Sequence, residues 1–240
     1  MLKKALLSFI FTAFFSAANA AITPTPVEDL RTDSEDCYLI GTADELYGFA
    51  ALISQGRLTA CGKLTENIVV NSNVIVGGKL SSDSSSFQQW APIGNQAPFM
   101  GIFDGQNHSI SGLYVNAQDN NLGMFGFVSG DAQVKNLKVV DSYVSGANNV
   151  QSSVYCGVGG IVGFATGNFV VNKVSFSGVV LGRYYVGGIA GQSVTPITMN
   201  DVSFSGTVSG YTEVGGIVGK QGSGRLTITN ASFNGTARAP

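Results

Sequence analysis

The feature that most constrains the fold of this chain is a glycine-rich hexapeptide that occurs three times at a fixed period. Its copies are Val158-Gly159-Gly160-Ile161-Val162-Gly163, Val186-Gly187-Gly188-Ile189-Ala190-Gly191 and Val214-Gly215-Gly216-Ile217-Val218-Gly219, and successive copies begin 28 residues apart. A second motif repeats in step with it, as Asn172-Lys173-Val174-Ser175-Phe176-Ser177-Gly178, Asn200-Asp201-Val202-Ser203-Phe204-Ser205-Gly206 and, more loosely, Asn230-Ala231-Ser232-Phe233-Asn234-Gly235. Two motifs that share one period indicate a repeat architecture.

The alternation of residue types inside the repeat predicts strands. In Val174-Ser175-Phe176-Ser177 the apolar side chains fall on one face and the serines on the other, which is the period of a strand. The repeat is too short and too rich in glycine for a pair of helices, so we expect an all-β fold, a parallel β-solenoid with one repeat per coil. Neighbouring coils then bury one another's apolar faces.

This arrangement makes specific predictions about the interior and the corners. Each set of equivalent residues should stack along the axis: isoleucines Ile161, Ile189 and Ile217; phenylalanines Phe176, Phe204 and Phe233; and a corner ladder of amides from Asn172, Asn200 and Asn230. Gly178, Gly206 and Gly235 occupy corners where a positive φ favours glycine. The Gly-Gly pairs allow close contact between coils. A phosphate-binding glycine loop would instead open a helix, whereas strand residues follow here.

The N-terminus has the form of a secretory signal. Residues 1–20 combine Lys3 and Lys4, an apolar run from Ala5 to Phe15 and a small-residue cleavage site at Ala18-Asn19-Ala20. The apolar run is shorter than a membrane-spanning helix, which needs about 20 residues, and no later segment is a candidate span. We therefore expect an extracellular or cell-surface protein. Removal of the two lysines changes the formal net charge from −2 to −4, which argues against nucleic-acid binding.

The mature chain divides into an extended lead-in, residues 21–36, and a single domain, residues 37–240. Near the start of the domain Thr42 and Glu45 form a capping-box pattern. Apolar residues then follow with helical spacing up to about Gly56, namely Leu46, Phe49, Ala50 and Ile53. We expect this helix to cap the first coil. After it, Lys63 to Val76 is predicted to continue as strand, with Val74 and Val76 on its apolar face, and residues 81–86 to form a polar loop.

Weaker copies of the repeat precede the regular ones. Leu122-Gly123-Met124-Phe125-Gly126 is a degenerate glycine motif, and Asn136-Leu137-Lys138-Val139 matches the second motif. Residues 147–153 are expected to form an inserted loop. Pro240 follows a repeat motif directly, so we expect the last coil to be covered by a partner or left open.

At this point the chain resembles bacterial GLUG-motif surface repeat proteins. The resemblance rests on the pattern from Tyr38 to Val70, on Trp90-Ala91-Pro92-Ile93-Gly94, Phe103-Asp104-Gly105 and Ile110-Ser111-Gly112-Leu113, and on the three glycine motifs. It implies a right-handed parallel β-helix on an exported, surface-associated protein, often of adhesin type. Some members carry the motif beside an immunoglobulin-cleaving zinc peptidase domain. That activity does not transfer, because the chain has no His-Glu-x-x-His and His108 is its one histidine. The sequence also contains no sortase-type Leu-Pro-x-Thr-Gly signal.

Three cysteines remain in the predicted mature chain. Cys37 and Cys61 flank the capping helix, so a disulfide between them would join the cap to the first coil. Such a bridge encloses 23 residues, which corresponds to about 3 kcal/mol in the loop-entropy model. The alternative is that both are buried thiols. Cys156 is either a small buried residue or a reactive thiol.

Few residues suggest chemistry. The run from Phe103 to His108 admits a carboxylate and imidazole site of a polysaccharide-active enzyme, or a tight turn in which Asp104 and Asn107 bond the local backbone and Gly105 has a positive φ; we favour the turn. No paired acids, calcium-type aspartate repeats or zinc ligand set occur, so we expect no metal or cofactor. Four tyrosines are candidates for exposed ligand contacts, with the covering of a solenoid side as the alternative: Tyr143, Tyr184, Tyr185 and Tyr211.

These observations favour an exported, adhesin-like binding module with no catalytic site of its own and with an extracellular glycan or protein as its partner. The alternatives are a polysaccharide-active β-helix enzyme or its accessory carbohydrate-binding unit, and a structural stalk.

Overall fold

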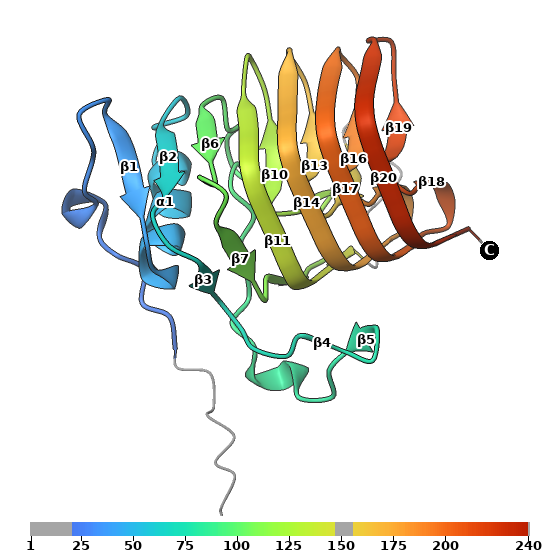
Figure 1. Cartoon of the computed structure of the whole chain (residues 1–240), viewed down its shortest axis with the longest axis horizontal. Helices are drawn as coiled ribbons and strands as arrows, with labels where there is room; N and C mark the ends of the chain where they lie inside the picture. The colour runs from blue at the N-terminus through green and yellow to red at the C-terminus, as the bar shows by residue number, and fades with distance from the viewer. Residues whose placement is uncertain (1–20, 147–155, 240) are drawn as a thin grey trace, which may run out of the picture.

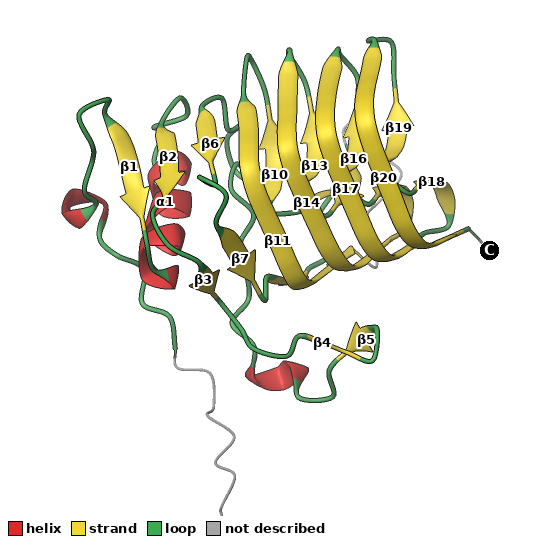
Figure 2. Cartoon of the chain, in the orientation of Figure 1, coloured by secondary structure: helices red, strands yellow, loops and turns green. Residues whose placement is uncertain are grey.

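The computed structural model describes residues 21–146 and 156–239. The predicted signal peptide, residues 1–20, and the predicted inserted loop, residues 147–153, lie outside them. The described chain is mostly β, with parallel sheets and one α-helix (Figure 2). The first part contains η1 (Val27–Asp29), β1 (Cys37–Ile40), α1 (Ala43–Ser54), β2 (Cys61–Leu64), β3 (Ile68–Val69), β4 (Ile75–Val76), β5 (Lys79–Leu80), η2 (Ser84–Ser86), β6 (Ile102–Asp104), β7 (Ser109–Ser111) and β8 (Tyr114–Asn116).

The second part is built from a recurring unit of one long strand and two short ones. The long strands are β11 (Gln133–Gly146), β14 (Phe169–Gly182), β17 (Ile197–Ser209) and β20 (Leu226–Arg238). The short strands are β9 (Asn121–Leu122), β12 (Gly157–Gly159), β15 (Tyr184–Gly187) and β18 (Thr212–Gly215), and β10 (Phe125–Val128), β13 (Val162–Ala165), β16 (Ala190–Ser193) and β19 (Val218–Gln221). Each set pairs with itself in parallel, and Figure 1 shows the long strands side by side.

The register of the parallel pairs confirms two of the predicted interior ladders. The Phe176 and Phe204 rings stack with centroids 5.8 Å apart, and Phe204 and Phe233 stack at 5.7 Å. The isoleucines align through the backbone, because Ile161 N donates to Ile189 O at 3.0 Å and Ile189 N donates to Ile217 O at 2.9 Å. The predicted degenerate copy is also in place, since Leu122 pairs with Val158 and Phe125 with Val162.

The two sequence motifs repeat in step because they touch inside each unit. The second glycine of each Gly-Gly pair lies against a phenylalanine ring: a Cβ on Gly160 would lie 2.6 Å from Phe176, one on Gly188 2.6 Å from Phe204, and one on Gly216 2.5 Å from Phe233. Real Cβ atoms do not approach other atoms so closely, so each large ring requires a glycine opposite it.

The predicted amide ladder is wrong by one residue. Asn172 pairs with Asn200, but the next strand pairs Thr229 with Asn200. Asn230 instead lies beside Asp201 and donates to its carboxylate at 2.9 Å. The reason is spacing, because Asn172 and Asn200 precede the stacked phenylalanines of their motifs by four residues, whereas Asn230 precedes Phe233 by three. Asn230 therefore takes the position of Lys173 and Asp201 at the bend, where φ is positive. Gly178 and Gly206 have positive φ as predicted, with values of 152° and 131°, whereas Gly235 does not.

The helix α1 covers the start of the stack, as the capping-box pattern predicts. Thr42 Oγ1 accepts from Glu45 N at 3.1 Å, and Glu45 Oε2 accepts from Thr42 N at 3.1 Å. The Phe49 ring packs edge-to-face against Phe103 at 5.8 Å. A disulfide joins Cys37 to Cys61 across β1 and β2, as predicted. Within the described ranges no helix is both long and apolar enough to cross a membrane.

At the other end the last unit lacks a covering layer among the described residues. Phe204 is 1% exposed, whereas its equivalent in β20, Phe233, is 38% exposed. Met199 is fully buried, whereas Ile228, which pairs with it, is 39% exposed. These differences follow from position alone, because each inner unit is covered by the next.

Candidate functional site

The run from Asp104 to His108 forms a turn, as the sequence analysis favours. Asp104 is 6% exposed and accepts hydrogen bonds from Gln106 N at 2.9 Å and from Asn136 Nδ2 at 3.0 Å. Burial acts to raise the pKa of Asp104, but these hydrogen bonds and the charge of Lys135 outweigh it, so its pKa is lowered. The expected positive φ at Gly105 is wrong: Gln106 and Asn107 carry it, with φ of 49° and 66°. The Asp104 carboxylate therefore stabilises the turn through the hydrogen bonds that it accepts.

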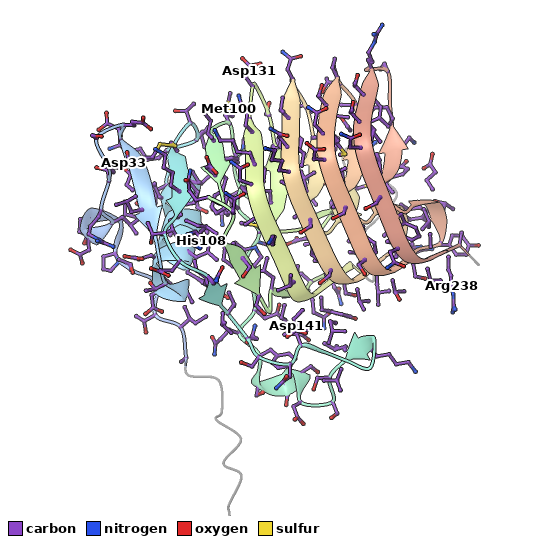
Figure 3. The ribbon with its side chains drawn as sticks, in the orientation of Figure 1. Asp33, Met100, His108, Asp131, Asp141 and Arg238 are labelled. Carbon is purple, nitrogen blue, oxygen red and sulfur yellow. A yellow bond between two sulfur atoms is a disulfide. The ribbon has the colours of Figure 1, made fainter. Side chains whose placement is uncertain are left out.

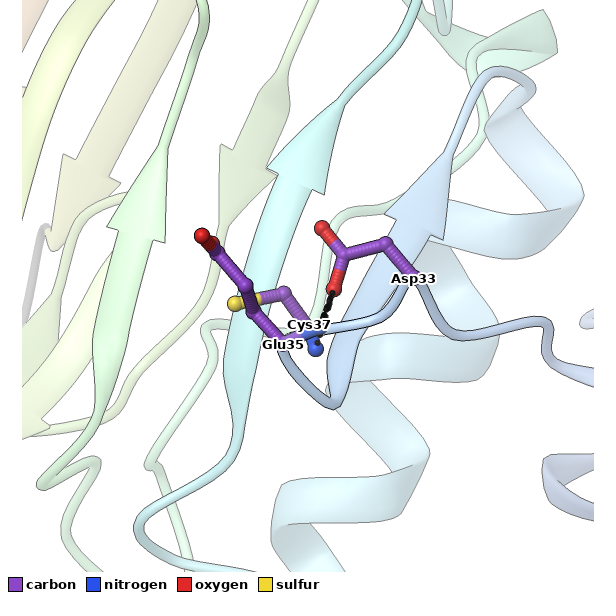
Figure 4. Close-up of side chains that lie close together, drawn as sticks. All are labelled: Asp33, Glu35 and Cys37. Carbon is purple, nitrogen blue, oxygen red and sulfur yellow. Dashed lines mark hydrogen bonds between the residues drawn. The ribbon is translucent and has the colours of Figure 1, made fainter.

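One group of acids near the cap has the closeness of a metal site but not its chemistry. The carboxylates of Asp33 and Glu35 lie near the Cys37 sulfur (Figure 4). That sulfur is in the disulfide with Cys61 and is not a thiolate. Both carboxylates form ion pairs with Lys63, and Asp33 also accepts from Cys37 N at 3.0 Å. The hydrogen bond from Lys63 is the main cause of the lowered pKa of Asp33. These contacts join the segment that precedes β1 to β2.

The four candidate tyrosines differ in exposure. The expectation of exposed rings is wrong for Tyr143 and Tyr184, which are 9% and 6% exposed, whereas Tyr211 is 61% exposed. Tyr185 is intermediate, and Lys220 Nζ lies 4.1 Å from its ring centroid. The Arg183 guanidinium lies 5.3 Å from the ring centroid of Tyr184. The rings of Tyr184 and Tyr185 are thus covered largely by the protein itself.

Tyr143 is covered by a hairpin arm that the sequence analysis did not predict. Strands β4 and β5 pair antiparallel around Gly77 and Gly78, with φ of 59° and 78°. Two consecutive residues of positive φ are typical of a type I′ turn. This arm replaces the predicted strand through Val76, and Val76 is accordingly 58% exposed. Figure 1 shows it beneath the lower ends of the long strands.

The arm is held against the sheet by a carboxylate and an apolar cluster. Asp141, labelled in Figure 3, accepts from Val74 N at 3.1 Å and from Ile75 N at 2.7 Å. Where the arm packs on the sheet, the Tyr114 and Tyr143 rings stack with centroids 5.8 Å apart. The apolar cluster between the arm and the sheet comprises Val74, Tyr114, Tyr143 and Val179, with Ile75, Leu80, Phe87 and Leu181 against them.

The space between the arm and the outer face of the long strands is a groove, here named the arm groove. Its first part, of about 480 Å³, is lined by Gly78, Lys79, Leu80, Tyr143, Val179, Leu181, Thr207, Thr236 and Arg238. A second part adjoins it through Leu181 and Arg238 and adds Gly182, Ser209, Gly210, Tyr211 and Ala239. Two of the four candidate tyrosines therefore line adjoining parts of this surface, Tyr143 the first part and Tyr211 the second.

Register aligns the floor of the arm groove along the stack of units. Val179, Thr207 and Thr236 occupy equivalent positions in β14, β17 and β20, and so do Leu181, Ser209 and Arg238. Neighbouring strands are about 4.8 Å apart, so each row presents side chains at that interval. The floor combines methyl groups and hydroxyls, with basic groups from Lys79 and Arg238 at its edges.

Comparison with known proteins gives a likeness in fold. No model of a protein family matches the chain, and no curated protein sequence matches it. Among solved structures it is similar to a protein of Bacteroides ovatus described as a "putative immunoglobulin A1 protease". That similarity has a TM-score of 0.54 and 16% sequence identity, and covers 85% of this chain and 68% of the other. At this identity the likeness concerns the fold alone.

Sequence reasoning missed most of the arm groove. Lys79 and Leu80 belong to a segment outside the repeats, and nothing in its pattern indicates where it packs. Arg238 could have been found, because it is the basic residue in the row that also contains Leu181 and Ser209.

Proposed function

We propose that this chain is an exported, surface-associated binding module of the adhesin-like type that holds an extracellular ligand in the arm groove. We infer that its stacked units form a right-handed parallel β-helix of the kind found in GLUG-motif surface proteins. The export signal in residues 1–20 and the Cys37–Cys61 disulfide support a location outside the cytoplasm. The B. ovatus likeness supports the β-helix assignment through fold alone.

The observation that carries the proposal is that the two parts of the arm groove adjoin at Leu181 and Arg238. The arm is held by hydrogen bonds to Asp141, and it lines the groove together with side chains from three successive units. The exposed ring of Tyr211 lies in the adjoining part. A floor of methyl and hydroxyl groups, basic groups at the edges and an accessible aromatic ring are elements that binding grooves commonly combine.

A polysaccharide-active enzyme is the less favoured alternative. Its best candidate group, the Asp104 carboxylate, accepts hydrogen bonds from Gln106 and Asn136 and forms an ion pair with Lys135 at 3.4 Å. A two-carboxylate glycosidase site requires a second acid across the scissile bond, and neither part of the arm groove includes an acid among its described lining residues.

The test is retention of the mature chain, residues 21–240, on immobilised polysaccharides and matrix proteins, with released sugar measured in the same samples. We expect retention without release, and weaker retention for Tyr211→Ala. Tyr185→Ala is the matched control, because it removes a ring of the same kind outside the arm groove. Release of sugar would favour the enzyme. Retention of nothing, or equal losses for the two variants, would contradict the proposal.

A further inference from the structure

The charges around the arm groove select one class of ligand. Among its described lining residues the charged side chains are Lys79 and Arg238, both basic, although the chain as a whole has 15 acidic and 13 basic residues. The carboxylate of Asp141, which holds the arm, accepts two hydrogen bonds from the backbone of the arm. A groove with basic edges in an acidic protein is complementary to an anion.

The shape of the groove suits an extended polymer. It crosses three successive long strands, and its floor repeats the same positions in each of them: Val179, Thr207 and Thr236. Arg238 lies in both parts of the groove, at their junction, and Lys79 lies on the arm above the first part. One bound chain running along these rows can therefore meet both cations.

The chemistry of the floor favours a glycan over an acidic peptide. Extended peptides are commonly bound by addition to a free strand edge. The arm groove instead lies on the face of the sheet, over side chains of β14 and β17, whose edges pair with their neighbours. Among the described strands, the free edge at this end of the sheet is that of β20, and the arm strands are only two residues long. What the groove offers instead are hydroxyls from Thr207, Ser209 and Thr236 and an exposed Tyr211 ring. Hydroxyl groups and the apolar faces of sugar rings match this set.

We propose that the arm groove binds a linear anionic polysaccharide, with Lys79 and Arg238 contacting its acidic groups and Tyr211 contacting a sugar ring. This inference rests on the proposed binding function and gives its ligand class. The acidic group is a carboxylate or a sulfate ester, since both form charge-assisted hydrogen bonds with lysine and arginine.

The test compares binding to polygalacturonate, dextran sulfate, neutral dextran and poly-glutamate at low and high salt. We expect at least one of the two anionic glycans to bind roughly tenfold or more tightly than dextran and poly-glutamate, with affinity falling as salt rises. Which of the two binds more tightly distinguishes a carboxylated from a sulfated ligand.

The variant that tests the site is Lys79→Glu/Arg238→Glu. Its matched control is Lys138→Glu/Lys173→Glu, which makes the same change in net charge at two exposed lysines outside the arm groove. We expect the first variant to lose anionic-glycan binding by at least about tenfold for each charge, and the control to retain it. Both variants should keep the wild-type circular dichroism spectrum, because all four residues lie on the surface.

Three results would overturn the inference. Equal losses in the two variants would make binding a matter of overall charge, and equal binding of poly-glutamate would show that sugar is not required. Tight binding of neutral dextran or a matrix protein that depends on Tyr211 but not on Lys79 and Arg238 would contradict the anionic class alone. That third result would leave the binding function standing, whereas retention of no ligand at all would remove both.

Discussion

Gly188 lies directly against the ring of Phe204, so that a Cβ at position 188 would be 2.6 Å from the ring and 2.2 Å from Gly216 O. Phe204 cannot move aside, because Phe176 and Phe233 stack on its two faces at 5.8 and 5.7 Å. This contact explains why the glycine motif and the Ser-Phe-Ser motif recur with one period. Each motif supplies one half of the same packing arrangement.

Gly188→Ala should therefore destabilise the chain by about 1–3 kcal/mol or more, as overpacking of a close-packed interior does. Gly216→Ala should cost less, because the atoms close to its added Cβ belong to the Phe233 ring, which is 38% exposed and can shift. Phe233→Leu should restore much of the loss caused by Gly216→Ala, whereas Phe204→Leu cannot remove the backbone clash at position 188. Urea unfolding of the single and double variants measures how far each phenylalanine substitution offsets the loss caused by its glycine substitution. Equal losses at the two glycines would contradict this account.

Asp141→Asn should loosen the arm. The Asp141 carboxylate accepts from two backbone N–H groups of the arm, and an amide offers only one acceptor atom. Asparagine tolerates the left-handed φ of 49° at this position, so the strand itself should be preserved. Loss of a hydrogen bond to a charged group costs about 1.5–3 kcal/mol. We expect amide exchange at Val74 and Ile75 to accelerate by at least about tenfold, with weaker ligand retention.

Asp131→Asn provides the control for this prediction, because it removes the same charge from an exposed residue whose carboxylate bonds Asn168 instead of the arm. Unchanged exchange at Val74 and Ile75 in Asp141→Asn would show that the apolar cluster alone holds the arm.

The cysteines should give a simple thiol count. Cys37 and Cys61 form a disulfide, whereas Cys156 is buried, and burial raises the pKa of its thiol. The denatured, unreduced mature chain should therefore contain one titratable thiol, and the native chain should react slowly. Cys37→Ser/Cys61→Ser should lower the free energy of unfolding by about 3 kcal/mol for a bridge with a sequence separation of 24. Three titratable thiols would refute the pairing.

Stability should fall with acid partly through Asp104. Because the pKa of this carboxyl is lowered in the folded chain, its contribution is complete above the unfolded pKa of about 3.9 and is lost as pH falls through the lower folded value. Asp104→Asn should be less stable than wild type at pH 7, by about 1 kcal/mol. The difference should shrink as the pH falls below about 4. Urea midpoints across this range measure it, with Asp131→Asn as a charge-matched control. A difference that stays constant with pH would assign the loss to packing.

The local sequence pattern was sufficient to predict contacts between residues close in the chain and contacts between equivalent residues of stacked repeats. Thr42 and Glu45 lie three residues apart and form the predicted capping box. The phenylalanine ladder followed from the period, because parallel stacking places equivalent residues in contact. The amide ladder failed at its third member, because Asn230 lies one residue closer to its phenylalanine than Asn172 and Asn200 do.

The sequence by itself determined the stack and the helix α1, because each depends on repetition or on residues close in the chain. It left Cys37 and Cys61 either bridged or as buried thiols, and the structure shows the bridge. Only the tertiary structure decided the arm groove. Its wall comes from residues 78–80 and its floor from residues 143–238. They are brought together by Asp141, whose partners Val74 and Ile75 lie 67 and 66 residues away. A non-repeating segment can pack against any part of a regular surface, and its position is set by long-range contacts that no local pattern encodes.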